Sequence, residues 1–211
     1  MEASAQHGNT GALSGLHPFG PAARLPDAIA RASAVHAVLA LKDGEFQLGQ
    51  QISLASMGLS LQGPVDAEGS ALPRISCNAT ASPPCVSVSA SHASFARIAF
   101  VDSQQAVAVR PSTRYVTFVD CAFEGNYGSA RTIGAALVVQ ASAAVDLRRC
   151  VFRDNTAQQN DGAAVLALFA TLVVDSCRFE RNSAQNGAAV YALSTSLHFA
   201  NSVCLRNRAR E

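Results

Sequence analysis

Two of the six cysteines lie close enough in the sequence to form a local disulfide. Cys77 and Cys85 enclose NATASPP, a stretch of turn-forming residues. Asn78 begins the tripeptide Asn-Ala-Thr, an acceptor sequence for N-linked glycosylation. A disulfide and a glycan would both indicate an oxidising secretory route. Sequons also arise by chance and neighbouring cysteines can stay reduced, so the Cys77–Cys85 bond and the Asn78 glycan are hypotheses.

Three other cysteines recur at nearly regular intervals. Cys121, Cys150 and Cys177 are separated by 29 and 27 residues. A zinc site would require CxxC or His-pair spacing, which the sequence lacks. We therefore interpret them as a column of buried apolar thiols. Such neighbours would be near enough to bridge, although the side-by-side orientation in a parallel sheet opposes it. We predict no metal and no cofactor.

Carboxylates and arginines are the remaining groups that could perform chemistry. Paired carboxylates can act as acid and base in glycoside hydrolysis, and clustered carboxylates bind calcium. The five histidines are isolated, so no Ser-His-Asp arrangement follows from spacing. Because solvated turn residues explain the carboxylates more simply, we assign no catalytic residue and leave an enzyme as the alternative. The candidates are Asp120, Asp146, Asp154, Asp161 and Asp175 with Arg148 and Arg149.

These residues belong to an internal repeat. Residues 121–126, 150–155 and 177–182 read CAFEGN, CVFRDN and CRFERN, all matching Cys-x-Phe-x-x-Asn. Two degenerate copies bring the number to five: Ile98-x-Phe100-x-x-Ser103 and Ser202-x-Cys204-x-x-Asn207. Such self-similarity at a fixed period is typical of a stacked repeat protein.

Each repeat also contains a Gly-Ala-Ala motif and an alternating apolar pattern. The motif occupies 134–137, 162–165 and 187–190, and the positions five and three before each Cys, or its counterpart, are apolar. Alternation of period two marks strands with one buried face. Three short strands in about 25 residues can pair only with copies in neighbouring coils, about 4.8 Å away. The sequence therefore predicts an all-β solenoid, a parallel β-helix.

Stacked coils would place equivalent residues in columns. Phe100, Phe123, Phe152 and Phe179 would form an aromatic column inside. Asn126, Asn155, Asn182 and Asn207 would occupy a corner, where Asn tolerates left-handed backbone angles and its side chain bonds the turn. Glycines would serve the next corner. We expect a solvated outward column of Val101, Glu124, Arg153, Glu180 and Leu205.

The chain divides into a lead and a stack. Residues 1–24 read as a flexible segment, 25–34 as a cap helix, 35–97 as lead-in coils and 98–211 as regular repeats. No matching cap follows the last repeat, so we expect a truncated C-terminal end belonging to a longer polypeptide.

Composition limits the function classes. The net charge is +1 and basic residues are scattered, which excludes the electrostatic footprint of a nucleic-acid binder. No apolar run is long enough to span a membrane, and residues 1–24 lack the apolar core of a signal peptide. The protein is therefore either intracellular or exported by a targeting segment that lies elsewhere.

The repeats resemble those of known β-helices. Residues 25–211 resemble the pectin lyase-like superfamily of right-handed β-helices, and FEGN, FRDN and FERN with GAAL and GAAV look like the Phe-x-x-Asn and Gly-Gly-Ala-Ile repeats of polymorphic outer membrane proteins. This resemblance implies a right-handed coil and surface display or adhesion. It also implies a carbohydrate-active lyase or hydrolase as the alternative, although the Asn-Thr-Asp, Asp-Asp, His-Gly and Arg-Ile-Lys patterns of polygalacturonases are missing.

The segments between Asn and Gly vary most: YGSARTI, TAQQND and SAQN. Insertions in solenoids gather on one face, which is often the binding face. Tyr127, Arg131 and Gln158 are therefore candidate ligand contacts, with plain solvent loops as the alternative. We predict a non-catalytic extracellular or cell-surface segment that binds glycans or surface proteins. A groove lined by Ala, Ser and Gln would favour binding, whereas three clustered acids with an Arg or Lys would favour an enzyme.

Overall fold

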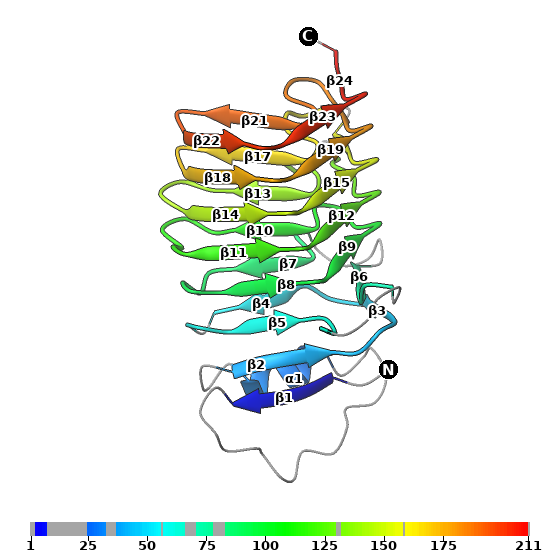
Figure 1. Ribbon diagram of the computed structural model, residues 1–211, viewed down its shortest axis with the longest axis vertical. Coiled ribbons are helices and arrows are strands. Elements are labelled where there is room, and N and C mark those ends of the chain that lie inside the picture. Colours follow the sequence, from blue (N-terminus) through cyan, green and yellow to red (C-terminus); the bar gives the residue numbers. More distant parts are fainter. Residues whose placement is uncertain are drawn as a thin grey trace.

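The computed structural model describes residues 3–7, 25–32, 37–55, 57–65, 71–77, 83–129, 132–157 and 159–210. Successive coils stack along one axis, and each regular coil contributes one strand to each of three long parallel sheets (Figure 1). The predicted parallel β-helix is confirmed.

Sheet A begins at the N-terminal end, where its first pair is antiparallel and all later pairs are parallel. Its strands are β1 (Ala3–His7), β2 (Ala37–Leu41), β5 (Ser60–Gln62), β8 (Ser94–Ala96), β11 (Val116–Val119), β14 (Ala144–Arg148), β18 (Thr171–Asp175) and β22 (Ser196–Ala200).

Sheet B follows sheet A in each coil. Its strands are β3 (Glu45–Leu48), β6 (Arg74–Cys77), β9 (Ala99–Val101), β12 (Ala122–Glu124), β15 (Val151–Arg153), β19 (Arg178–Glu180) and β23 (Val203–Leu205).

Sheet C closes the coil, and a short sheet D lies between sheets B and C in the later coils. Sheet C contains β4 (Ile52–Leu54), β7 (Val86–Val88), β10 (Val107–Val109), β13 (Leu137–Val139), β17 (Val165–Leu168) and β21 (Val190–Leu193). Sheet D contains β16 (Thr156–Ala157), β20 (Ser183–Ala184) and β24 (Arg208–Ala209).

The strand register follows the repeat. Phe123 pairs with Phe100 on one side and with Phe152 on the other, so the phenylalanines stack inside the coil. The ring centroids of Phe123 and Phe152 are 4.5 Å apart, and those of Phe152 and Phe179 are 5.0 Å apart. These rings are buried, which makes the aromatic column a main part of the core.

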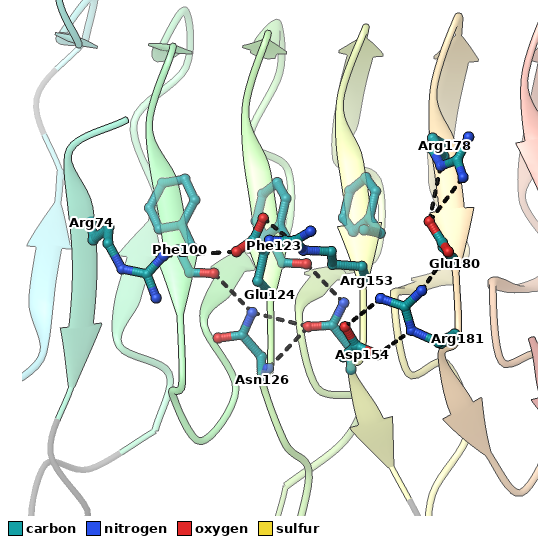
Figure 2. A network of polar contacts seen from close by, with 12 residues as sticks. Arg74, Phe100, Phe123, Glu124, Asn126, Arg153, Asp154, Arg178, Glu180 and Arg181 are labelled. Carbon is teal, nitrogen blue, oxygen red and sulfur yellow. Dashed lines mark hydrogen bonds and ion pairs between the residues drawn. The ribbon is translucent and has the colours of Figure 1, made fainter. Parts of the chain in front are cut away.

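The asparagines form a second interior column, a ladder that runs up the stack (Figure 2). Asn126 donates its side-chain amide to the Phe100 carbonyl at 3.0 Å and to the Asn155 Oδ1 at 3.0 Å. The Asn155 Oδ1 also accepts the Asn126 backbone N–H, and Asn155 repeats the pattern with Asn182. Every buried turn amide in this column therefore has a partner.

The prediction that these asparagines adopt left-handed backbone angles is wrong. The left-handed residue is the one before each asparagine or its counterpart, and this column contains Asp102, Gly125, Asp154, Arg181 and Arg206. A left-handed residue bends the chain so that the following side chain points inward, where the carboxamide satisfies the turn. The glycine column does adopt positive φ, with 66°, 68° and 58° at Gly134, Gly162 and Gly187.

The N-terminal end of the stack is covered by α1 (Leu25–Ala32), which packs against β1 and β2 (Figure 1). Leu25, Ala28 and Ile29 face the core. Strand β1 lies within the segment that the sequence predicts to be flexible. It pairs with β2 through residues 3–7.

At the other end, β21 to β24 form the last coil described, and several of its apolar side chains are exposed: Leu193, Leu197, Phe199, Val203 and Leu205. The truncation of the chain stays a prediction.

Candidate binding grooves on the outer surface

A hollow of about 320 Å³ lies where the loops between sheets D and C meet the outer face of sheet C. Its floor is apolar, formed by Leu166 and Leu168 of β17 and by Leu193 of β21, with Tyr191 beside them. Carboxamides surround this floor. We call this site the amide groove; its other lining residues are Ile133, Gly134, Gln159, Asn160, Asp161, Gln185 and Asn186.

Hydrogen bonds hold the loops of the amide groove in place. Asn160 donates its side-chain amide to the Ser129 carbonyl at 2.6 Å, and Asn186 donates to the Asp161 Oδ1 at 2.9 Å. The Gly162 N–H donates to the Asn186 carbonyl at 3.0 Å. A Cβ at Gly162 would lie 2.6 Å from the Leu166 Cβ, so this turn requires glycine for space as well as for its positive φ.

The remaining polar groups are available to a ligand. Within the described part of the chain, the side chains of Gln159 and Gln185 have no hydrogen-bond partner, and Asp161 uses one carboxylate oxygen. The described lining residues include one carboxylate and no arginine or lysine. The groove can therefore offer both donors and acceptors above an apolar and aromatic floor.

A second hollow, of about 380 Å³, lies on the outer face of sheet B near the N-terminal coils. Arg74 lines it and contacts three carboxylates, with nitrogen to oxygen distances of 3.6 Å to Glu45, 3.8 Å to Asp102 and 3.8 Å to Glu124. We call this site the charged hollow; it is lined by Glu45, Gln47, Arg74, Ser76, Cys77, Val101, Asp102 and Tyr127.

The family model for the right handed beta helix region matches residues 65–204. The chain belongs to the right-handed β-helix family. The match covers most of the regular repeats and the whole amide groove, and it agrees with the expected handedness of the coil. No curated protein and no solved structure matches the chain.

Ion pairs cover the outer face of sheet B in this β-helix (Figure 2). Arg153 contacts Glu124 at 3.0 Å, and Arg181 contacts both Glu180 and Asp154. Hydrogen bonds from Arg181 hold the pKa of Asp154 below its usual range. Hydrogen bonds from Arg178 do the same to the pKa of Glu180.

The five candidate aspartates do not gather in one groove. Asp120 pairs with Arg149 at 2.7 Å, and this contact lowers the pKa of Asp120. Asp146 pairs with Arg148 at 2.6 Å. Asp175 pairs in register with Arg148, lies near Arg149 and accepts a hydrogen bond from Asn201. The other two are elsewhere: Asp154 pairs with Arg181, and Asp161 lines the amide groove.

The structure describes one of the three predicted contact residues. Tyr127 is 38% exposed and lines the charged hollow, not the amide groove. Arg131 and Gln158, like Asn78, lie outside the described residues. The sequence pointed to the loop segments TAQQND and SAQN, which do supply the amide groove. It missed Tyr191, because alternation alone does not tell which outward residue borders a loop.

The cysteines divide into three environments. Cys77 and Cys85 are bonded, with an S–S distance of 2.01 Å. Cys121, Cys150 and Cys177 are free and buried, and the hydrogen bond between the Cys150 and Cys121 side chains, with burial, raises the pKa of the Cys150 thiol. Cys204 is free and exposed. Among the described residues, no group of three His, Cys, Asp or Glu side chains could hold a metal ion.

No helix in the described ranges is both long and apolar enough to cross a bilayer.

Proposed function

We propose that this β-helix binds a neutral glycan in the amide groove. The observation that carries the proposal is an apolar floor with Tyr191, surrounded by four carboxamides and lacking any basic side chain among its described lining residues. Sugar rings present an apolar face and a rim of hydroxyls. The floor would cover the ring face, while amides would donate to and accept from the hydroxyls.

The solenoid geometry favours a polymer over a single sugar. The groove takes residues from three successive coils, which carry β13, β17 and β21. Coils repeat about every 4.8 Å, a step comparable with the length of one hexose residue. A glycan chain that runs along the stack would therefore meet similar loops at each coil.

An extracellular or cell-surface location belongs to this proposal. The Cys77–Cys85 disulfide supports it, because such bonds persist in oxidising compartments. The likeness of the repeats to polymorphic outer membrane proteins supports an adhesive role, in which surface proteins are a second class of partner.

The alternative is a carbohydrate-active enzyme of the pectin lyase-like superfamily, and one observation favours it. Three carboxylates surround Arg74 beside the charged hollow, two of them lining it, which comes close to the clustering expected of a catalytic site. Against this reading, all three carboxylates already lie within ion-pair distance of the Arg74 guanidinium, and Glu124 also contacts Arg153. Their charges stabilise that contact before any substrate arrives.

Binding to an array of neutral and acidic polysaccharides tests the proposal. The Tyr191→Ala variant should bind the recognised neutral glycan up to about tenfold more weakly because it loses the stacking surface. Gln185→Ala should weaken binding by a smaller factor, and Arg153→Ala, on sheet B, serves as the matched surface control. Equal binding by wild type and Tyr191→Ala, or no neutral ligand at all, would overturn the proposal.

The same array distinguishes the enzyme. With calcium present, the appearance of unsaturated products would favour catalysis, and loss of that activity in Asp102→Asn would assign it to the charged hollow. Binding without product, retained in Asp102→Asn, would support the glycan-binding reading.

A further inference from the structure

The corner between sheets C and A changes length along the stack. It spans residues 110–115 between β10 and β11, 140–143 between β13 and β14, and 169–170 between β17 and β18. The corner that ends at residue 115 is therefore the longest of these three.

Tyr115 is the last residue of this longest corner, and its aromatic side chain is exposed. Its ring stacks on His92 of the preceding coil, with centroids 4.8 Å apart and planes at 22°. The Tyr115 residue is 63% exposed, so the other ring face is open to solvent. The stack fixes the ring in place, because His92 occupies the face toward the N-terminal coils.

The backbone at this stack is unusual for aromatic residues. His92 has φ of 60° and Tyr115 has φ of 59°, which is the left-handed region. A bulky residue adopts this region at a conformational cost. In other coils, Gly58, Ser142 and Phe169 have positive φ at this corner. Hydrogen bonds hold the strained turn: His92 N–H donates to the Arg114 carbonyl, and Arg114 N–H donates to the Ser91 Oγ.

Next to the Tyr115 ring lies a hollow of about 370 Å³. Ser142 and Ala144 of the next coil line it, and Thr171 of the following coil lies beyond them. Arg114 also lines the hollow. In the part of the chain that the structure describes, the Arg114 guanidinium has no hydrogen bond or ion pair, unlike the paired arginines of sheet B.

We propose that this corner hollow binds a sugar ring that carries an anionic group. The face of the sugar ring would lie against Tyr115, whose position is fixed by His92. The Arg114 fork would bind a carboxylate or sulfate with two parallel hydrogen bonds. Ser142 and Thr171 supply hydroxyls for the remaining polar edge.

This site differs from the amide groove in both place and chemistry. It uses the corner after sheet C, whereas the amide groove uses the loops before it. It recognises charge through a guanidinium that the amide groove lacks. The inference is therefore independent of the proposed function, and either can fail alone.

Ligand-detected NMR with three monosaccharides tests the corner hollow. The probes are methyl glucuronide, glucose 6-sulfate and methyl glucoside, which carry a carboxylate, a sulfate and no charge. We expect at least one anionic probe to bind more tightly than the neutral one, and the preferred anion identifies the source. Indistinguishable binding of all three probes would overturn the proposal.

Variants locate the binding. Arg114→Gln and Tyr115→Ala should each lower the affinity for the anionic probe by about tenfold. Tyr115→Phe should keep the wild-type affinity because the aromatic ring remains. Arg206→Gln removes the same charge from an exposed arginine of the last coil and should have no effect. Equal losses in Arg114→Gln and Arg206→Gln would mean general electrostatic attraction and would overturn the site.

Two further readouts separate the remaining explanations. Thermal melts of Tyr115→Ala and Tyr115→Phe show whether a loss of binding reflects a destabilised corner. If only Tyr115→Ala loses binding, its melting temperature is also lowered, and Arg114→Gln binds as the wild type does, the proposal is overturned. Tyr191→Ala, in the amide groove, should leave the anionic probe bound as tightly as in the wild type. If Tyr191→Ala abolishes this binding, the anionic sugar occupies the amide groove and the corner proposal fails.

Discussion

Inner and outer columns of the same coils obey different constraints. Phe123, Phe152 and Phe179 repeat one side chain inside the coil, whereas the residues that follow them, Glu124, Arg153 and Glu180, alternate in charge outside it. An interior side chain must match its neighbours above and below in size and hydrogen bonding. An exterior side chain meets water, so each coil can differ. Stability therefore resides in the repeated columns and binding chemistry in the departures from them.

Phe152→Ala should give the largest effect on stability. Its ring is fully buried between two stacked rings, so truncation leaves a cavity in the column. We expect a loss of about 3–5 kcal/mol in the free energy of unfolding, measured by denaturant titration. Arg153→Ala, one residue away on the outside, should change it by less than about 0.5 kcal/mol. Similar values for the two variants would contradict the division between inner and outer columns.

Asn155→Ala should have the second largest effect on stability, a loss of about 1–3 kcal/mol in the free energy of unfolding. The variant removes the acceptor of the Asn126 N–H and side-chain amide and the donor to the Phe123 carbonyl, all inside the coil. These buried groups would lose their partners without access to water. In thermal melts, the melting temperature of Asn155→Ala should be far below that of Arg153→Ala. Equally small changes in both variants would show that the ladder does not stabilise the corner.

Gly162→Ala tests whether a loop of the amide groove obeys interior constraints. Gly162 has a φ of 68° and no space for a Cβ, so we expect a loss of about 1–3 kcal/mol together with weaker glycan binding. Gly49 is the matched control, because nothing lies within 4 Å of a Cβ placed there. If Gly162→Ala and Gly49→Ala have the same melting temperature, the turn at Gly162 tolerates a side chain and the loop adapts.

The same division explains what could be predicted. Cys-x-Phe-x-x-Asn repeats predict the strand register and the interior columns, because the stack forces equivalent residues together. The repeat did not reveal that the residue before each Asn takes the left-handed turn, since aspartate, glycine and arginine all occupy it. The loop segments pointed to the amide groove, whereas nothing in the repeat pointed to the corner hollow. Whether Tyr191 and Tyr115 line a hollow depends on the lengths of the neighbouring loops and corners, and these lengths vary from coil to coil.

The pH dependence at Asp154 should be the smallest effect. Arg181 lowers the pKa of Asp154 in the folded protein, so the pair contributes stability above the unfolded pKa of about 4 and loses it as the pH falls through the lower folded value. Both side chains are partly exposed, so water and salt weaken the contribution. Asp154→Asn should therefore lower the melting temperature slightly at neutral pH and reduce its decline in acid. Asp43→Asn, at an exposed carboxylate, is the control. An acid profile unchanged in Asp154→Asn, or changed equally in Asp43→Asn, would show that the outer ion pairs do not stabilise the stack.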